Sequence, residues 1–352
     1  MRVFQCARCE QTLYFENHRC ERCSTPQAFD PISFSMVALT ENGQSQSGVG
    51  LCANAQHGVC NWLAAPTDPG GLCLACASNR TIPNLDDSRQ IELWKTLETA
   101  KHRLVYGLLQ LGLPLRTKLQ NPAEGLAFDF MGSLDPRFRE DDSVMTGHAD
   151  GVVTIHLAEA DDVEREKVRN NMAEPYRTVL GHFRHEIGHY YWQLLVAPNP
   201  ERLNAFRERF GDERADYGEA LDRHYNEGPP NDWRAQYVSA YATSHPWEDF
   251  AESWAHYLHI VDTLETAYSF GIQLRPRHGE RSTLSGKAAF NPYRPANFET
   301  LLDAWWPITF AVNSLNRSMG QPDLYPFVLS QPAIDKLAHV HALIRACDRQ
   351  EG

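Results

Sequence analysis

The chain has 352 residues, a formal net charge of −12 at pH 7, 42% hydrophobic residues and 22% charged residues. This length suits one large domain and a small one, and the composition is typical of a globular protein. The acidic balance argues against general nucleic-acid binding and against docking on anionic membranes.

Membrane insertion and secretion are also disfavoured. The longest apolar candidate, Leu104–Leu115, is too short to span a bilayer, and the N-terminus lacks the basic and apolar regions of a signal peptide. We therefore expect a cytoplasmic protein. In a reducing compartment its nine cysteines would be metal ligands rather than disulfides.

The first cysteine group consists of two tight pairs, Cys6-x-x-Cys9 and Cys20-x-x-Cys23. Each pair can form a knuckle whose backbone amides face the sulfurs, and two knuckles supply four thiolates to one tetrahedral zinc. The stretch Thr12–Glu16 between them indicates a short strand. This spacing predicts a zinc ribbon over residues 1 to about 30.

A second cysteine group lies between residues 33 and 80 and contains Cys52, Cys60, Cys73 and Cys76. Only its second half is a tight pair, and His57 competes with the first two cysteines for a place in the ligand set. We predict a second four-cysteine zinc site, because a short segment with little regular pattern needs metal to stabilise it. Cys347, the ninth cysteine, is interpreted as a bystander.

Zinc ribbons often bind nucleic acid, but this one lacks the charge to do so. The first eighty residues contain five arginines and no lysine, against six acidic residues. A phosphate-binding surface needs clustered positive charge. We expect the ribbons to pack on the rest of the protein or to hold a protein partner.

The remaining chain predicts an α+β domain, with a boundary that divides the protein into residues 1–85 and 86–352. A helix is expected over Arg89–Gly112 and a strand over Leu126–Phe130. Two strands, Val144–His148 and Val152–His156, flank Ala-Asp-Gly and indicate a hairpin. We expect a small β-meander followed by a mainly helical domain of zincin-like type.

The most informative stretch of this domain is His185-Glu-x-x-His189. On a helix, residues four apart lie on one face, so the two imidazoles can reach one ion. Glu186 is rotated off the pair and can act as general base on a water molecule. The apolar neighbours of the motif predict a buried helix, in which two histidines and a glutamate require a partner.

A catalytic zinc keeps three protein ligands, so a third is needed. The metzincin pattern fails, because Trp192 and Leu195 occupy its glycine and histidine positions. A downstream helix starting near Pro246 offers Glu248 and Glu252 on one face. Either can be the third ligand; we take Glu248, and expect Glu252 to hold a ligand histidine in the correct tautomer.

The downstream helix also carries a family resemblance. The sequence Glu248-Asp-Phe-Ala-Glu252 resembles the Glu-x-Phe-Ala-Glu helix of gluzincins related to the anthrax lethal factor protease. The resemblance covers only the two motif stretches. It implies that the first glutamate binds zinc and that the tyrosine seven residues earlier, Tyr241, steadies the oxyanion. His245 is the alternative for that role.

Nearly the whole chain is similar to a bacterial family of zinc-binding metallopeptidases with an N-terminal zinc ribbon. The similarity includes the cysteine-rich start, Cys60–Trp62, Cys73–Cys76 and Asn79–Pro83. It implies hydrolysis of a peptide or protein substrate, with one catalytic and two structural zinc ions. Two alternatives stay open: a protein-binding scaffold of little activity, and a zinc amidohydrolase acting on a non-peptide amide.

Overall fold

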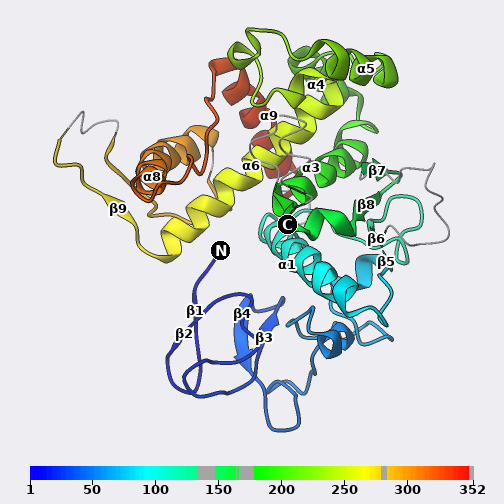
Figure 1. Ribbon diagram of the computed structural model, residues 1–352, viewed down its shortest axis with the longest axis vertical. Coiled ribbons are helices and arrows are strands. Elements are labelled where there is room, and N and C mark those ends of the chain that lie inside the picture. Colours follow the sequence, from blue (N-terminus) through cyan, green and yellow to red (C-terminus); the bar gives the residue numbers. More distant parts are fainter. Residues whose placement is uncertain (133–146, 164, 166–177, 279–283, 296, 349–352) are drawn as a thin grey trace. The chain divides into compact units, whose positions relative to one another are not determined.

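Figure 1 shows the protein as a computed structural model, which describes residues 1–132, 147–163, 165, 178–278, 284–295 and 297–348. By compactness, the chain divides into two units. The first combines Met1–Tyr106 with Leu115–Glu166, and the second combines Gly107–Pro114 with Lys167–Gly352. The sequence boundary at residue 85 stays a prediction.

The cysteine-rich start of the first unit is built from short antiparallel strand pairs. Strand β1 (Phe4–Gln5) pairs with β2 (Thr12–Leu13), and β3 (Gln27–Asp30) pairs with β4 (Ser35–Ala38). The strand expected over Thr12–Glu16 is thus confirmed over its first two residues. Short helical turns follow at Ala53–His57 (η1) and Cys76–Ser78 (η2).

A segment this short has little core of its own, and a group of aromatic side chains forms part of that core. Phe29 packs against both Phe15 and Trp62, with 4.9 Å between ring centroids in each pair. Tyr106 of helix α1 (Ser88–Gln110) joins the group, 5.3 Å from Phe15. Helix α1 therefore completes the core of the cysteine-rich segment.

A four-stranded sheet completes the first unit. Its order is β5 (Asn79–Thr81), β6 (Ala127–Met131), β8 (Val152–His156) and β7 (Gly147–Ala149). Strand β6 is buried along its whole length, and Arg80 pairs with Asp129 across β5 and β6. The predicted strand near residue 126 is confirmed. The hairpin is confirmed for its described residues, and residues 144–146 lie outside them.

The predicted β-meander is wrong, because β5, β6 and β8 run parallel and only β7 is antiparallel to its neighbour. In a meander, each strand would pair antiparallel with the next one along the chain. Strand β8 buries Val153 and Ile155, so it occupies an interior position of the sheet. The short Gly-His-Ala strand β7 has no large apolar side chain and suits an edge.

The described part of the second unit is mainly helical, and β9 (Gln273–Leu274) pairs antiparallel with β10 (Gly286–Lys287). Its longer helices are α3 (Val179–Tyr191), α4 (Pro200–Phe210), α5 (Tyr217–Glu227), α6 (Pro246–Ser269), α8 (Phe298–Ser318) and α9 (Gln331–Asp348). A π-helical turn, η4 (Trp192–Val196), extends α3, and short 3-10 turns lie at η5 (Trp233–Ala235) and η6 (Tyr241–Thr243). Within the described ranges, no helix combines the length and apolarity needed to cross a membrane.

Helix α6 is the central element of the second unit. It is buried around most of its circumference and packs against α3, α4, α8 and α9, and Figure 1 shows it as the long yellow helix. Its start follows from local sequence: Nδ1 of His245 accepts a hydrogen bond from the backbone N–H of Trp247 (3.2 Å), and Pro246 occupies the first turn. This start places Glu248 in the first turn of α6.

The motif helix α3 approaches α6 most closely at Gly188. A Cβ atom at this position would lie 2.9 Å from Cα of Ala251 and 3.1 Å from Cβ of Trp254. Contacts this short with backbone cannot be relieved by rotating a side chain. The glycine between the motif glutamate and its second histidine therefore sets the spacing at which α3 meets α6.

We expect the substitution Gly188→Ala to destabilise the protein by about 1–3 kcal/mol, the usual cost of an extra methyl group in a packed interior. Urea unfolding followed by circular dichroism measures the change. Gly107→Ala is the matched control, because Gly107 lies inside α1 and an added methyl group there would have no neighbouring atom within 4 Å. The control should stabilise by about 0.5–1 kcal/mol, and an equal response of both variants would refute the close approach.

Candidate metal centres

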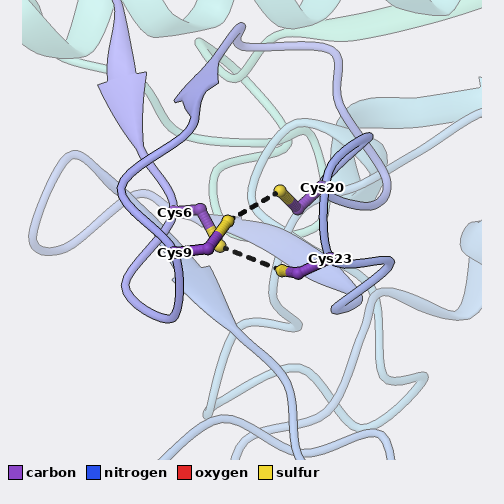
Figure 2. Close-up of side chains that lie close together, drawn as sticks. All are labelled: Cys6, Cys9, Cys20 and Cys23. Carbon is purple, nitrogen blue, oxygen red and sulfur yellow. Dashed lines mark hydrogen bonds between the residues drawn. The ribbon is translucent and has the colours of Figure 1, made fainter.

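The first cysteine group converges on one point, as the spacing predicts. Sγ of Cys6 lies 3.7 Å from Sγ of Cys23, and Sγ of Cys9 lies 3.5 Å from Sγ of Cys20. Figure 2 shows the four side chains turned toward one another. Thiolates at about 2.3 Å from a tetrahedral zinc lie about 3.8 Å apart, so the four sulfurs fit one ion.

Two equivalent turns produce this arrangement. The backbone N–H of Glu10 donates to the carbonyl of Cys6 (2.9 Å), and the N–H of Ser24 donates to the carbonyl of Cys20 (2.8 Å). Glu10 and Ser24 both have positive φ, 60° and 58°, directly after the second cysteine of each pair. The two knuckles expected from sequence are therefore present as repeats of one local conformation.

The second cysteine group also converges, and it is fully buried. Its members are Cys52, Cys60, Cys73 and Cys76, whose sulfurs all lie within 4.8 Å of one another. The Sγ atoms of Cys60 and Cys73 are 3.7 Å apart. His57 is not part of the group; its ring lies against Trp94, 6.3 Å between centroids. The looser first half of this group is thus brought into place by the fold rather than by a tight local turn.

A third convergence joins the two informative helices of the second unit. Nε2 of His185 lies 3.2 Å from Nε2 of His189 and 2.9 Å from Oε2 of Glu248. Nε2 of His189 lies 3.4 Å from Oε1 of Glu248. Nitrogen and oxygen ligands at about 2.0–2.2 Å from zinc lie about 3.3–3.6 Å apart in a tetrahedron. The ligand atoms of the two imidazoles and the carboxylate lie 2.9–3.4 Å apart, close to or slightly below this spacing, and their chemical types are those of a catalytic zinc site.

The two glutamates of α6 lie on opposite sides of the His185 ring. Nδ1 of His185 donates to Oε1 of Glu252 (2.7 Å), while its Nε2 faces Glu248. The Glu248 side chain is 1% exposed. Burial raises the pKa of Glu248, but His189 and His185 outweigh burial and hold this pKa well below its usual value. The arrangement makes Glu248 the candidate ligand and Glu252 the group that orients His185.

Glu186 lies in the same helix but has a different partner. Nε2 of His182 donates to Oε1 of Glu186 at 3.1 Å. Burial raises the pKa of Glu186, but the hydrogen bond with His182 and the nearby imidazoles of His185 and His189 lower it overall. Glu186 is therefore a carboxylate at neutral pH, the form that can accept a proton.

Two tyrosines border the histidine site, and only one is suggested by the sequence motifs. Tyr241 lies in η6, with its ring centroid 5.8 Å from that of His185. Burial raises the pKa of Tyr241 well above its usual value, and the charge of Glu248 raises it further, so its phenol stays protonated. The hydroxyl of Tyr217, which our sequence reasoning missed, donates to Oε1 of Glu248 at 2.8 Å.

No local signal identifies Tyr217 as a site residue. The sequence indicates only a helix start there, because Asp216 caps α5 by accepting a hydrogen bond from the N–H of Glu219. The histidine considered as an alternative to Tyr241, His245, is occupied elsewhere. Its Nδ1 caps α6, and its Nε2 donates to the backbone carbonyl of Ala215 at 3.1 Å.

Two family models match the chain. Residues 90–343 match a family described as "Putative zinc-binding metallo-peptidase", and residues 3–87 match a zinc-ribbon domain. Proteins from Mycobacterium tuberculosis and Mycobacterium bovis, both described as uncharacterized, are 42% identical over 344 residues, which is 98% of this chain and 95% of each relative. No solved structure matches the chain significantly. The chain therefore belongs to this family of zinc-binding metallo-peptidases and carries an N-terminal zinc-ribbon domain.

Proposed function

We propose that the protein is a zinc-dependent peptidase with a gluzincin-like catalytic domain. The observation that carries this proposal is the convergence of His185 and His189 on α3 with Glu248 on α6. These ligands come from two helices, with His185 and Glu248 separated by 63 positions in the sequence, and both helices are buried. An ionisable set of this kind is costly to bury unless it binds a cation.

Zinc bound by these three residues would supply a Lewis acid and a water molecule with a pKa near neutrality. Glu186 would take a proton from the attacking water and later give it to the leaving amine. Tyr241, protonated at neutral pH, would donate a hydrogen bond to the oxyanion that develops on the substrate carbonyl. Glu252 keeps His185 in the tautomer whose Nε2 faces the metal position.

Two structural zinc ions, one in each cysteine group, would accompany the catalytic ion. We infer a cytoplasmic location, because cysteine groups that hold metal suit a reducing compartment. The substrate would be a peptide or protein, and the ribbons could hold a protein partner. The retained carboxylate and phenol favour catalysis over a scaffold role, since a scaffold would need neither of them.

Replacing Glu186 with Gln should leave the metal content unchanged and lower peptide hydrolysis by about 10²- to 10⁴-fold, because the variant cannot accept the proton. A screen of proteomic peptides by mass spectrometry first identifies a cleaved substrate. The matched control is Glu208→Gln on the exposed face of α4, which should keep wild-type turnover. Retained turnover in the Glu186 variant would refute the mechanism.

Replacing Tyr241 with Phe should lower kcat by about 10²- to 10³-fold with the zinc content unchanged, because one oxyanion donor is removed. The ratio of kcat to KM should fall equally, since the hydrogen bond would form only in the transition state. An unchanged kcat in this variant, alongside a large loss in Tyr217→Phe, would assign the donor role to Tyr217 instead.

Measuring the zinc content of two variants distinguishes the roles of the two glutamates of α6. Glu248→Ala should remove one zinc per chain after gel filtration, because it deletes a ligand. Glu252→Gln should retain that zinc but weaken its binding by about 10- to 100-fold, the usual cost of losing a group that orients a ligand. Loss of the ion in Glu252→Gln but not in Glu248→Ala would reverse the two assignments.

A further inference from the structure

Helix α1 brings an additional nitrogen to the second cysteine group. Nε2 of His102 lies 3.3 Å from Sγ of Cys60 and 3.8 Å from the Sγ atoms of both Cys73 and Cys76. His102 is 4% exposed, so no bulk water competes for these contacts. The imidazole faces three of the four sulfurs that would surround a metal ion.

The other side of the imidazole is fixed by α1 itself. Nδ1 of His102 donates to the backbone carbonyl of Glu98 at 2.7 Å, one helical turn earlier. The His102 ring also packs edge-on against Trp62, 5.1 Å between centroids. These contacts hold the ring in one orientation, with Nε2 directed at the sulfurs.

The sulfurs differ in their backbone donors. Sγ of Cys60 accepts from the N–H of Trp62 (3.4 Å), and Sγ of Cys73 accepts from the N–H of Cys76 (3.3 Å). Sγ of Cys52 accepts from the N–H of Cys73 (3.2 Å).

Sγ of Cys76 faces side chains instead, with Oε2 of Glu98 at 3.9 Å and Nε2 of His102 at 3.8 Å. Nδ1 of His102 also lies 3.2 Å from Oε2 of Glu98, so the imidazole contacts both this carboxylate and the sulfur of Cys76.

A second metal ion beside Cys76 is an alternative, since Cys76, Glu98 and His102 also lie close together. The contacts of Glu98 argue against it. Oε1 of Glu98 already accepts from Trp94 Nε1 (3.0 Å), Asn79 Nδ2 (2.7 Å) and Lys101 Nζ (2.9 Å). The buried Lys101 ammonium neutralises this carboxylate, which leaves no net negative charge for another cation.

We propose that His102 is a positioning residue of the second cysteine site, where it carries a proton on each ring nitrogen and its Nε2–H donates to the thiolates from outside the tetrahedron. A four-thiolate zinc site carries two negative charges, and in a buried position these charges need hydrogen-bond donors. Backbone N–H groups donate to the sulfurs of Cys52, Cys60 and Cys73, and His102 lies on the side of the group that contains the sulfur of Cys76. Helix α1 is thereby part of this metal centre.

The proposal assigns to the metal site a residue that lies outside the zinc-ribbon match. The ribbon match ends at residue 87, whereas His102 lies within the segment matched by the peptidase family. The compact first unit, in contrast, includes the chain up to Tyr106. The role of His102 does not depend on whether the His185 site hydrolyses peptides.

The test uses the full-length chain with its zinc replaced by cadmium-113 and observed by NMR. We expect two signals in the range of four-thiolate sites, one for each cysteine group, and one signal for the histidine site. A signal typical of three sulfurs and one nitrogen, in place of a four-thiolate signal, would make His102 a ligand and overturn the proposal. This measurement needs no substitution.

Zinc release to a chelator then tests the hydrogen bonds. His102→Leu should weaken binding of one zinc per chain by about 10- to 100-fold, and His102→Gln, whose amide can still donate, should lose less. His57→Gln is the matched control, because His57 lies in the same segment but not in the metal group. Wild-type release from both His102 variants would overturn the proposal.

Discussion

The candidate site of the helical unit depends on bringing a buried carboxylate, a buried imidazole and a partly buried imidazole to one point. Glu248 lies at the start of α6 and His185 within α3, so their contact exists only if these helices pack closely. Gly188 permits that packing, because a side chain there would collide with Ala251. Burying these ionisable side chains costs free energy when no cation is bound, and the same burial strengthens their electrostatic attraction to a bound cation. The same glycine therefore serves both the helix interface and the metal site.

In the cysteine-rich segment, metal binding would contribute to the stability of the fold. It has short strands and a small aromatic core, to which Tyr106 of α1 contributes. Two buried or partly buried thiolate groups supply the missing stability when they bind metal, because metal-binding free energy then adds to folding free energy. The helical unit has a large apolar core around α6 and does not need zinc for this purpose. Under the proposed function, metal would stabilise the fold of the ribbon and supply the chemistry of the helical unit.

The sequence predicts those parts of each site that are local. The pair His185 and His189 follows from helical spacing, and the Cys-x-x-Cys pairs follow from the knuckle conformation that Glu10 and Ser24 adopt. Site residues that come from distant parts of the chain are harder to predict. Glu248 and Glu252 stand out because the zinc needs a third ligand, not because spacing indicates which element meets α3. Tyr217 and His102 carry no motif, and the parallel pairing of β6 with β8 depends on which strand has the more apolar residues.

Each of the three metal groups combines a locally organised pair with residues supplied by a distant segment. The local pair costs little conformational entropy to form, since one turn or one helix already places both ligands. The distant residues must be held by packing: α6 holds Glu248, the second knuckle holds Cys20 and Cys23, and the folded segment around Trp62 holds Cys60. The free energy of metal binding therefore stabilises only the folded state in which all the ligands have been packed together. This linkage explains why the buried His102 and the exposed Tyr217 both lie against candidate ligands that arrive from far along the chain.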